Sequence, residues 1–161
     1  MRSELLNLSE QIHCTAVEVN GVAVLLRGAS GVGKSDLALR LIHEGANLIS
    51  DDRVDLNLSN GRLYATSPEN IRGLLEIHGT GVLEVGSIET AQVSLVVDLA
   101  SESDIERLPE PRYTVLLGQK VKVMRIDPFS VSATAKIRYS LKVAKGEVKN
   151  VGMIVSREKS N

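Results

Sequence analysis

The segment with the clearest chemical capacity is Gly28-Ala29-Ser30-Gly31-Val32-Gly33-Lys34-Ser35. It fits the pattern G-x-x-x-x-G-K-[ST], in which a glycine-rich loop surrounds phosphate groups with backbone N–H donors. Lys34 would place a positive charge on the β- and γ-phosphates, and Ser35 supplies a hydroxyl that can ligate Mg²⁺. We therefore predict that the chain binds a nucleotide at residues 28–36, with Asp36 as the last member of the segment.

The loop has the flanks that such a motif requires. The apolar run at 22–26 predicts a strand before it. Behind it, apolar residues recur at helical spacing and Gly45 stands where a helix would end. This pattern predicts a helix over roughly 34–44, with a core face made of Leu37, Ala38, Leu41 and Ile42.

A second candidate group follows this helix, where the apolar strand at 47–50 ends in Asp51 and Asp52. In open α/β sheets, ligands bind outside the carboxyl ends of the strands. A carboxylate there can hold Mg²⁺ or accept a proton, and two adjacent carboxylates separate their pKa values by repulsion. The pair therefore predicts a metal ligand and a base, without deciding which is which. Asp98, near the end of an apolar run, is a weaker metal candidate.

Asn20-Gly21 lies between two β-rich runs, 15–19 and 22–26, and predicts a two-residue hairpin. Such a turn pairs residue 19 with 22 and 17 with 24, and a longer ladder would pair 13 with 28. His13 would then lie beside Gly28, where an imidazole could contact phosphate. The alternative is a histidine at the end of a strand with a local hydrogen bond.

The remaining patterns predict the framework around these groups. Apolar and polar residues alternate over 54–59, and the Asn60-Gly61 turn that follows indicates a second hairpin. Ser67-Pro68-Glu69 is typical of a helix start, which predicts a short helix containing Ile71, Leu74 and Leu75. The other expected features are a strand at 94–99, a strand around 121–126, a last helix with the core positions 133, 137, 141 and 144, and loosely ordered ends at 1–11 and 156–161.

Composition limits the classes of protein to which the chain can belong. Its 161 residues, 43% of them hydrophobic, are expected to form a single α/β domain, 1–161. A net charge of -1, 2% aromatic residues and no Trp argue against a nucleic-acid partner. No apolar run is long enough to span a membrane. Cys14 is the only cysteine and no signal-peptide pattern is present, which favours the cytoplasm.

Four segments together resemble the C-terminal catalytic domain of bacterial HPr kinase/phosphorylase, over roughly 12–128. They are His13, the loop 28–35, the pair Asp51-Asp52, and the run 74–85. This run reads L-L-E-I-H-G-T-G-V-L-E-V and is similar to the family signature L-L-E-I-R-G-L-G-I-I-D-V. The resemblance implies the phosphate-loop kinase fold of the HPr kinase and phosphoenolpyruvate carboxykinase type, with a mixed sheet, antiparallel hairpins and flanking helices.

The resemblance also implies roles for single residues. His13 would contact phosphate, and Asp51-Asp52 would be the acid/base centre, with Asp52 favoured as the proton acceptor. Ser35 and Glu76 would hold Mg²⁺, with Asp51 as a further ligand. Arg107 stands where the family has an active-site arginine. The implied cofactors are ATP and Mg²⁺, the implied partner is a phosphocarrier protein of the HPr type in a phosphotransferase system, and the implied assembly is a hexamer.

The chain also departs from the family pattern. His78 and Thr80 replace an arginine and a leucine of the signature, and residues 125–132 lack both arginines of the family segment I-P-V-R-P-G-R-N. That segment is tied to phosphorolysis, so kinase activity is the main expectation and phosphorylase activity stays open. The chain looks like the short alphaproteobacterial form, which lacks the N-terminal domain of longer members. A kinase of a small hydroxylated metabolite and a non-catalytic nucleotide sensor remain alternatives.

Overall fold

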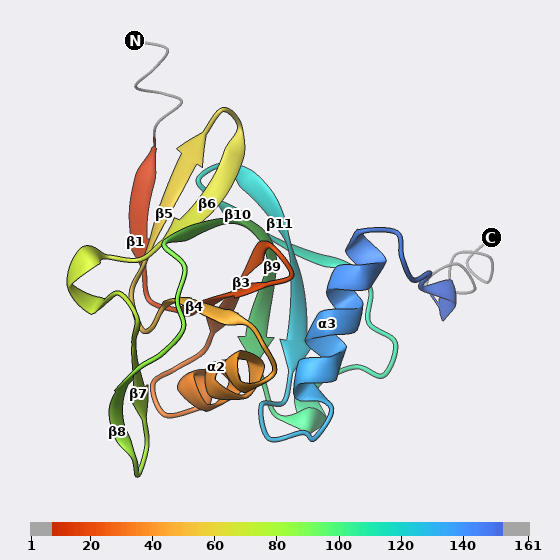
Figure 1. The fold of residues 1–161 in the computed structure, drawn as a ribbon. Coiled ribbons are helices and arrows are strands. Elements are labelled where there is room, and N and C mark those ends of the chain that lie inside the picture. The colour runs from red at the N-terminus through yellow and green to blue at the C-terminus, as the bar shows by residue number, and fades with distance from the viewer. Residues whose placement is uncertain (1–7, 153–161) are drawn as a thin grey trace.

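The structure is a computed structural model that describes residues 8–152 (Figure 1). In chain order its elements are β1 (Ser9–Ile12), β2 (Thr15–Val19), β3 (Val22–Arg27), α2 (Lys34–His43), β4 (Asn47–Ser50), β5 (Val54–Ser59), β6 (Arg62–Thr66), the 3₁₀ turn η1 (Glu69–Ile71), β7 (Leu74–Ile77), β8 (Gly81–Glu84), β9 (Thr90–Leu99), the 3₁₀ turn η2 (Glu102–Asp104), β10 (Arg112–Leu116), β11 (Gln119–Ile126) and α3 (Ala133–Ala144).

The long strand β9 joins two halves of one curled sheet (Figure 1). Its first residues pair with β6, and the sheet continues from there through β5 to β1. Its later residues lie between β3 and β11, both parallel to it. Antiparallel strands extend this half, with β2 and β4 beyond β3 and β10 beyond β11, while β7 and β8 form a separate hairpin. The predicted mixed sheet with antiparallel hairpins is confirmed.

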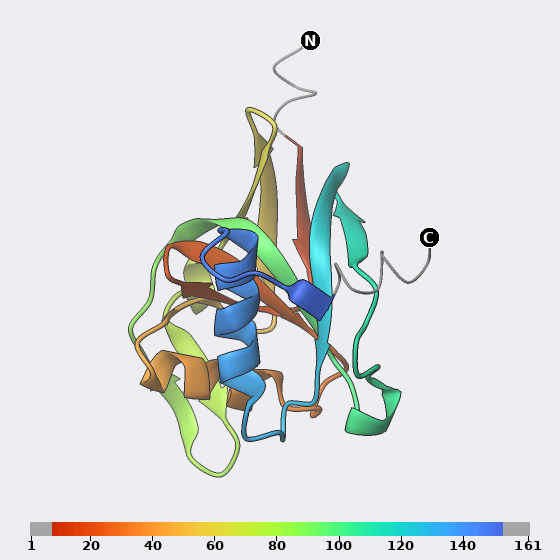
Figure 2. The same ribbon diagram turned by 90° about the vertical axis from the view of Figure 1, so that its right-hand side faces the viewer.

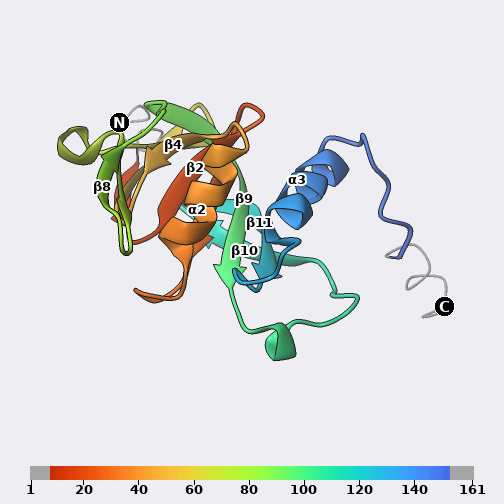
Figure 3. The same ribbon diagram turned by 60° about the horizontal axis from the view of Figure 1, so that its bottom comes forward.

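Strand β3 is buried on both faces, which explains its uninterrupted apolar sequence. Because side chains alternate along a strand, Val24 and Leu26 pack into one core and Ala23 and Leu25 into another. The first core lies against α2 and α3, which cover one face of the sheet (Figures 2 and 3). The second lies inside the curl of the sheet. A strand enclosed in this way is a rigid base for the loop that follows it.

The hairpin predicted at Asn20-Gly21 is confirmed in its register. Val17 pairs with Val24 and Val19 with Val22, and both turn residues have positive φ, 51° at Asn20 and 89° at Gly21. Two central residues of positive φ are what a type I′ hairpin turn requires. The second predicted hairpin, at Asn60-Gly61, is confirmed, as are the helix expected at 34–44 and the last helix. Ala144, expected on the core face of the last helix, is exposed.

Two expectations about the framework are wrong, and one strand is missing from the prediction. Residues 9–11 are not loosely ordered, because they form β1 and pair with β5. The short helix expected through Leu74 and Leu75 is only the turn η1; Gly73, with φ of 78°, ends it and leads into β7. Strand β10 was not predicted, although it pairs with β11 along its whole length. The expectations for 1–7 and 156–161 lie outside the described residues. No helix within 8–152 is long and apolar enough to cross a membrane.

Candidate nucleotide site

The candidate site lies at the end of the sheet where the carboxyl ends of several strands meet, called the sheet edge below. Strands β3, β9 and β11 are parallel, and β4 runs in the same direction because β3 and β4 both pair antiparallel with β2. Their carboxyl ends therefore meet at one edge, which the arrowheads of β9 and β11 mark in Figure 1. The loop after β3, the acids after β4 and the start of β2 all come to this edge, where ligands of open α/β sheets bind.

The predicted phosphate loop connects β3 to α2, as its motif requires. Gly31 and Gly33 have φ of 82° and 107°, in the left-handed region that glycine adopts without strain. Within the described residues, no hydrogen bond uses the amide of Gly31 or Gly33 as donor, so both amides are available to phosphate oxygens. Lys34 is 7% exposed, and its Nζ donates to the carbonyl oxygens of Gly28 and Ala29 at 2.5 and 3.1 Å. Its ammonium group is therefore held over the loop.

Asp51 connects three separate parts of the site. Its Oδ1 accepts hydrogen bonds from Ser35 Oγ at 3.0 Å and from Thr15 Oγ1 at 2.9 Å. Its Oδ2 accepts one from the backbone N–H of Glu76 at 3.2 Å. The loop, the start of β2 and strand β7 are thus fixed relative to one carboxylate. The structure brings together Ser35 and Asp51, which the sequence placed near a metal, and adds Thr15, for which no motif or spacing gave a signal.

Asp52 has an unusual backbone and a histidine partner. Its φ is 72°, a left-handed conformation that Asp and Asn adopt more readily than most residues. Its Oδ1 contacts Nε2 of His13, and the two side chains are 51% (His13) and 63% (Asp52) exposed. The ladder between β2 and β3 ends at Thr15 and Leu26, so His13 is not paired opposite Gly28 as a longer ladder would require. It reaches the site through Asp52 instead.

Glu76 and Arg107 stand apart from this cluster. The main chain of Glu76 contacts Asp51, whereas its side chain is exposed. Arg107 is exposed in the loop between η2 and β10, and none of the contacts found within residues 8–152 joins it to the phosphate loop. The same residues contain no cluster of three or more His, Cys, Asp or Glu side chains arranged to hold a metal ion.

Asp36 is tied to a neighbouring loop rather than to the aspartate pair. It forms an ion pair with Arg40 one turn later in α2, at 3.2 Å. Arg40 in turn donates to the carbonyl oxygens of Pro128 and Ser130, in the connection between β11 and α3. The loop after β11 is therefore fixed against the first turns of α2. Sequence patterns gave no indication of this role for Arg40.

An ion pair and a buried thiol lie near the site. Arg27, the last residue of β3, binds Asp98 of β9 through Nε at 2.7 Å and Nη2 at 3.0 Å. This hydrogen bonding raises the pKa of Arg27, against the opposing effect of burial. Asp98, considered as a metal candidate, is thus the partner of an arginine. Cys14 is fully buried, and burial raises the pKa of its thiol to about 12.

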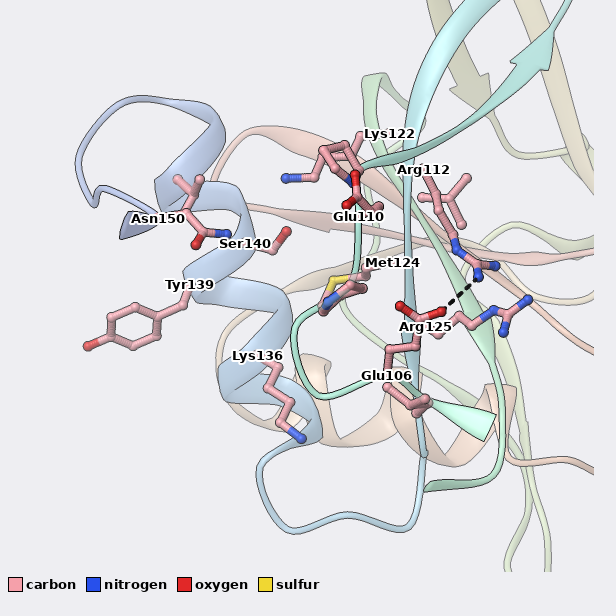
Figure 4. Close-up of a pocket in the computed structure, with 15 residues that line it drawn as sticks. Glu106, Glu110, Arg112, Lys122, Met124, Arg125, Lys136, Tyr139, Ser140 and Asn150 are labelled. Atoms are coloured by element: carbon pink, nitrogen blue, oxygen red, sulfur yellow. Dashed lines mark ion pairs between the residues drawn. The ribbon is translucent and has the colours of Figure 1, made fainter. Parts of the chain in front are cut away.

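One cavity lies apart from the phosphate loop. It has a volume of about 350 Å³ and lies between the loop 105–112, strand β11 and helix α3. Figure 4 shows Met124 in its interior and the ion pair of Arg112 with Glu106 at one side. None of the predicted site residues lines it.

The residues at this edge fit the groups that the sequence predicts. Amide donors and a buried ammonium group match the oxygens of a phosphate chain. Mg²⁺ prefers oxygen ligands and is usually held by one or two carboxylates together with substrate phosphates. Ser35 Oγ and the Asp51 carboxylate are oxygen donors of this kind, 3.0 Å apart.

The glycine-rich loop lies between a central parallel strand and a helix, and its serine donates a hydrogen bond to an aspartate. This arrangement defines a phosphate-loop nucleotide-binding protein. Comparison with known proteins identifies the family within this class. A family model described as HPr Serine kinase C-terminal domain matches residues 4–156, and the chain belongs to this family.

Individual relatives support this assignment. The HPr kinase/phosphorylase of Clostridium perfringens is 34% identical over 127 residues, covering 72% of this chain and 41% of that protein. The one from Leptothrix cholodnii is 40% identical over 123 residues, covering 68% and 38%. The chain therefore matches less than half the length of these curated relatives. The solved HPr(Ser) kinase/phosphatase of Coxiella burnetii has the same fold, with a TM-score of 0.77 at 23% identity, covering 88% of this chain and 99% of that one.

Proposed function

We propose that the chain is an ATP-dependent serine kinase of a phosphocarrier protein of the HPr type. The observation that carries this proposal is the hydrogen bond that Ser35 Oγ donates to Asp51, because it holds the paired aspartates against the phosphate loop. A nucleotide sensor needs the loop alone, whereas a kinase also needs a proton acceptor beside it. The names of the relatives supply the protein substrate, and the exposed sheet edge is accessible to a substrate of that size.

In this proposal the loop holds and orients ATP. The amides of Gly31 and Gly33 bind oxygens of the β- and γ-phosphates, and Lys34 neutralises charge that develops as the γ-phosphoryl group is transferred. Bound Mg²⁺ would neutralise further negative charge on the phosphates. Ser35 and Asp51 are the residues that would hold it, and Glu76 is a further candidate ligand because its main chain already contacts Asp51.

Asp52 is the proposed base. Its carboxylate accepts the proton of the substrate serine while the serine oxygen attacks the γ-phosphorus and the bond to ADP breaks. His13 keeps the Asp52 side chain in place through their contact, and the family resemblance makes it the candidate to contact the phosphoryl group. Catalysis of this type depends mainly on positioning and electrostatics. We assign no step to Arg107, because it lies in the loop beside the separate cavity.

The wider setting is part of the same proposal. ATP and the phosphotransferase system are found in the cytoplasm, and a buried free cysteine is compatible with that compartment. A single catalytic domain and assembly into a hexamer rest on the family resemblance. Phosphorolysis of the phosphoserine form stays open, because residues 125–132 lack the arginines of the corresponding family segment.

One assay separates the proposed function from its alternatives. Purified protein is incubated with γ-labelled ATP, Mg²⁺ and HPr-like carriers, and the label is located by mass spectrometry of the carrier. The proposal expects a phosphoserine in the carrier and none in a carrier whose acceptor serine is replaced by alanine. Label found only in a small hydroxylated metabolite would support a metabolite kinase. ATP binding without any transfer would support a sensor.

A further inference from the structure

The connection between β11 and α3 presents an exposed aromatic ring beside the phosphate loop. Phe129 is the only phenylalanine of the 161 residues and is 77% exposed. Its Cζ lies 3.8 Å from the position that a Cβ atom would occupy at Gly33. The ring is therefore accessible to a ligand that binds at the phosphate loop.

The topology indicates which part of a ligand would reach this ring. The phosphate loop follows β3, and Phe129 follows β11, two strands away in the same parallel group and at the same edge. A nucleotide whose phosphates occupy the loop can extend its base along this end of the sheet, over a loop that follows another of the parallel strands. The connection after β11 is such a loop, and its contact with Gly33 shows that it adjoins the phosphate site.

The backbone that carries the ring is held by several hydrogen bonds. Asp127 Oδ1 accepts a hydrogen bond from the N–H of Phe129 at 2.9 Å, and the carbonyl of Asp127 accepts one from the N–H of Ser130 at 3.1 Å. Arg40 binds the carbonyl oxygens on both sides of Phe129, those of Pro128 and Ser130. Pro128 is itself buried and lies against Gly33. Because this backbone is fixed, binding of a flat group to the ring orders only the side chain of Phe129.

We propose that Phe129 is the platform on which the purine base of the nucleotide stacks. This inference rests on the proposed function, since it takes the phosphates to lie at Gly28–Ser35. Stacking on an aromatic side chain tolerates different bases because every base has a π face. We therefore expect the site to distinguish ATP poorly from GTP. The competing explanation is that the Phe129 and Val131 side chains dock a partner protein. Docking would not require Phe129 to lie beside Gly33, whereas base stacking requires a position near the phosphate loop.

The test compares a ligand that has a base with one that has none. Dissociation constants for ATP and inorganic tripolyphosphate are measured by titration calorimetry with Mg²⁺, for the wild type, Phe129→Ala and Phe129→Tyr. Val131→Ala is the matched control, an exposed apolar side chain in the same loop. We expect Phe129→Ala to weaken ATP binding roughly tenfold, a typical stacking loss, and to leave tripolyphosphate binding unchanged. Phe129→Tyr and Val131→Ala should bind both ligands like the wild type.

Each other outcome has a definite meaning. Equal weakening of ATP and tripolyphosphate by Phe129→Ala would overturn the inference, because the loop itself would then be disturbed. Unchanged ATP binding with a raised KM for the carrier would also overturn it, in favour of docking. Neither result bears on the proposed function, which is tested by phosphate transfer from the wild type to the carrier. A wild type that binds neither ligand would remove the proposed function and the platform together.

Discussion

The hydroxyl oxygen of Thr15 lies 2.9 Å from Oδ1 of Asp51. Thr15 is fully buried. The same hydroxyl is 3.5 Å from the backbone N–H of Asp52. One side chain at the start of β2 therefore orients the carboxylate of Asp51 and the main chain that presents Asp52. Thr15 is a positioning residue in the proposed mechanism, since it acts through the aspartates.

Replacing Thr15 by valine keeps the shape of the side chain and removes its hydrogen bonds. Partners that orient a metal ligand typically contribute 10- to 100-fold in metal affinity. We expect the Mg²⁺ concentration needed for half-maximal kinase activity to rise by roughly this factor in Thr15→Val. Thr15→Ser retains the hydroxyl and should stay near the wild type. A loss of activity that Mg²⁺ cannot restore, equal in both variants, would indicate a general packing role instead.

The ion pair of Arg27 with Asp98 should affect the stability of the fold and not the binding of Mg²⁺. Its side chains are 32% and 36% exposed, so solvent screens the pair and its loss should cost only about 1 kcal/mol. We expect Asp98→Asn to lower the free energy of unfolding by about this amount, with a smaller difference at high salt. Chemical denaturation at low and high salt measures it. If Asp98→Asn also raised the Mg²⁺ requirement as Thr15→Val does, Asp98 would be a metal ligand after all.

Cys14 should be almost inert in the folded protein. Burial raises its pKa from an ordinary 9.0 to about 12, so the reactive thiolate is rarer by roughly a thousandfold at pH 8. Alkylation by iodoacetamide should accordingly be far slower in the native protein than in urea. Since the native pKa is raised, the native rate should keep rising up to about pH 12, whereas the unfolded rate should level off near pH 9. Equal rates at pH 8 would show that the thiol is accessible.

The local parts of the fold could be predicted because their causes are local. Asn20-Gly21 determines a turn of positive φ, and the turn alone determines that Val17 pairs with Val24. The phosphate loop likewise depends on its own glycines and on the elements next to it. Ser67-Pro68-Glu69 is typical of a helix start and predicts a helix that contains Leu74 and Leu75. The backbone at Gly73 and the pairing of β7 with β8 outweigh that signal.

The parts that could not be predicted depend on contacts between distant residues. Thr15 and Asp51 are 36 positions apart, and no periodicity relates a buried threonine to an acid beyond the next helix. Arg40 and Ser130 are 90 positions apart, so their hydrogen bond, which holds the loop of Phe129, could not be predicted from sequence patterns either. His13 was expected near the site for a different reason, an extended ladder that ends two residues too early. It meets Asp52 because β2 and β4 are neighbours in the sheet.

The most direct test of the proposed mechanism is Asp52→Asn. Asparagine adopts the left-handed backbone as readily as aspartate, so the φ of 72° should be kept while the base is lost. Rates of serine phosphorylation on an HPr-like carrier and dissociation constants for ATP are measured on the same preparations. We predict that Asp52→Asn transfers phosphate roughly 100- to 10,000-fold more slowly and binds ATP like the wild type. Transfer at the wild-type rate would contradict the assignment of Asp52 as the base of a carrier-protein kinase.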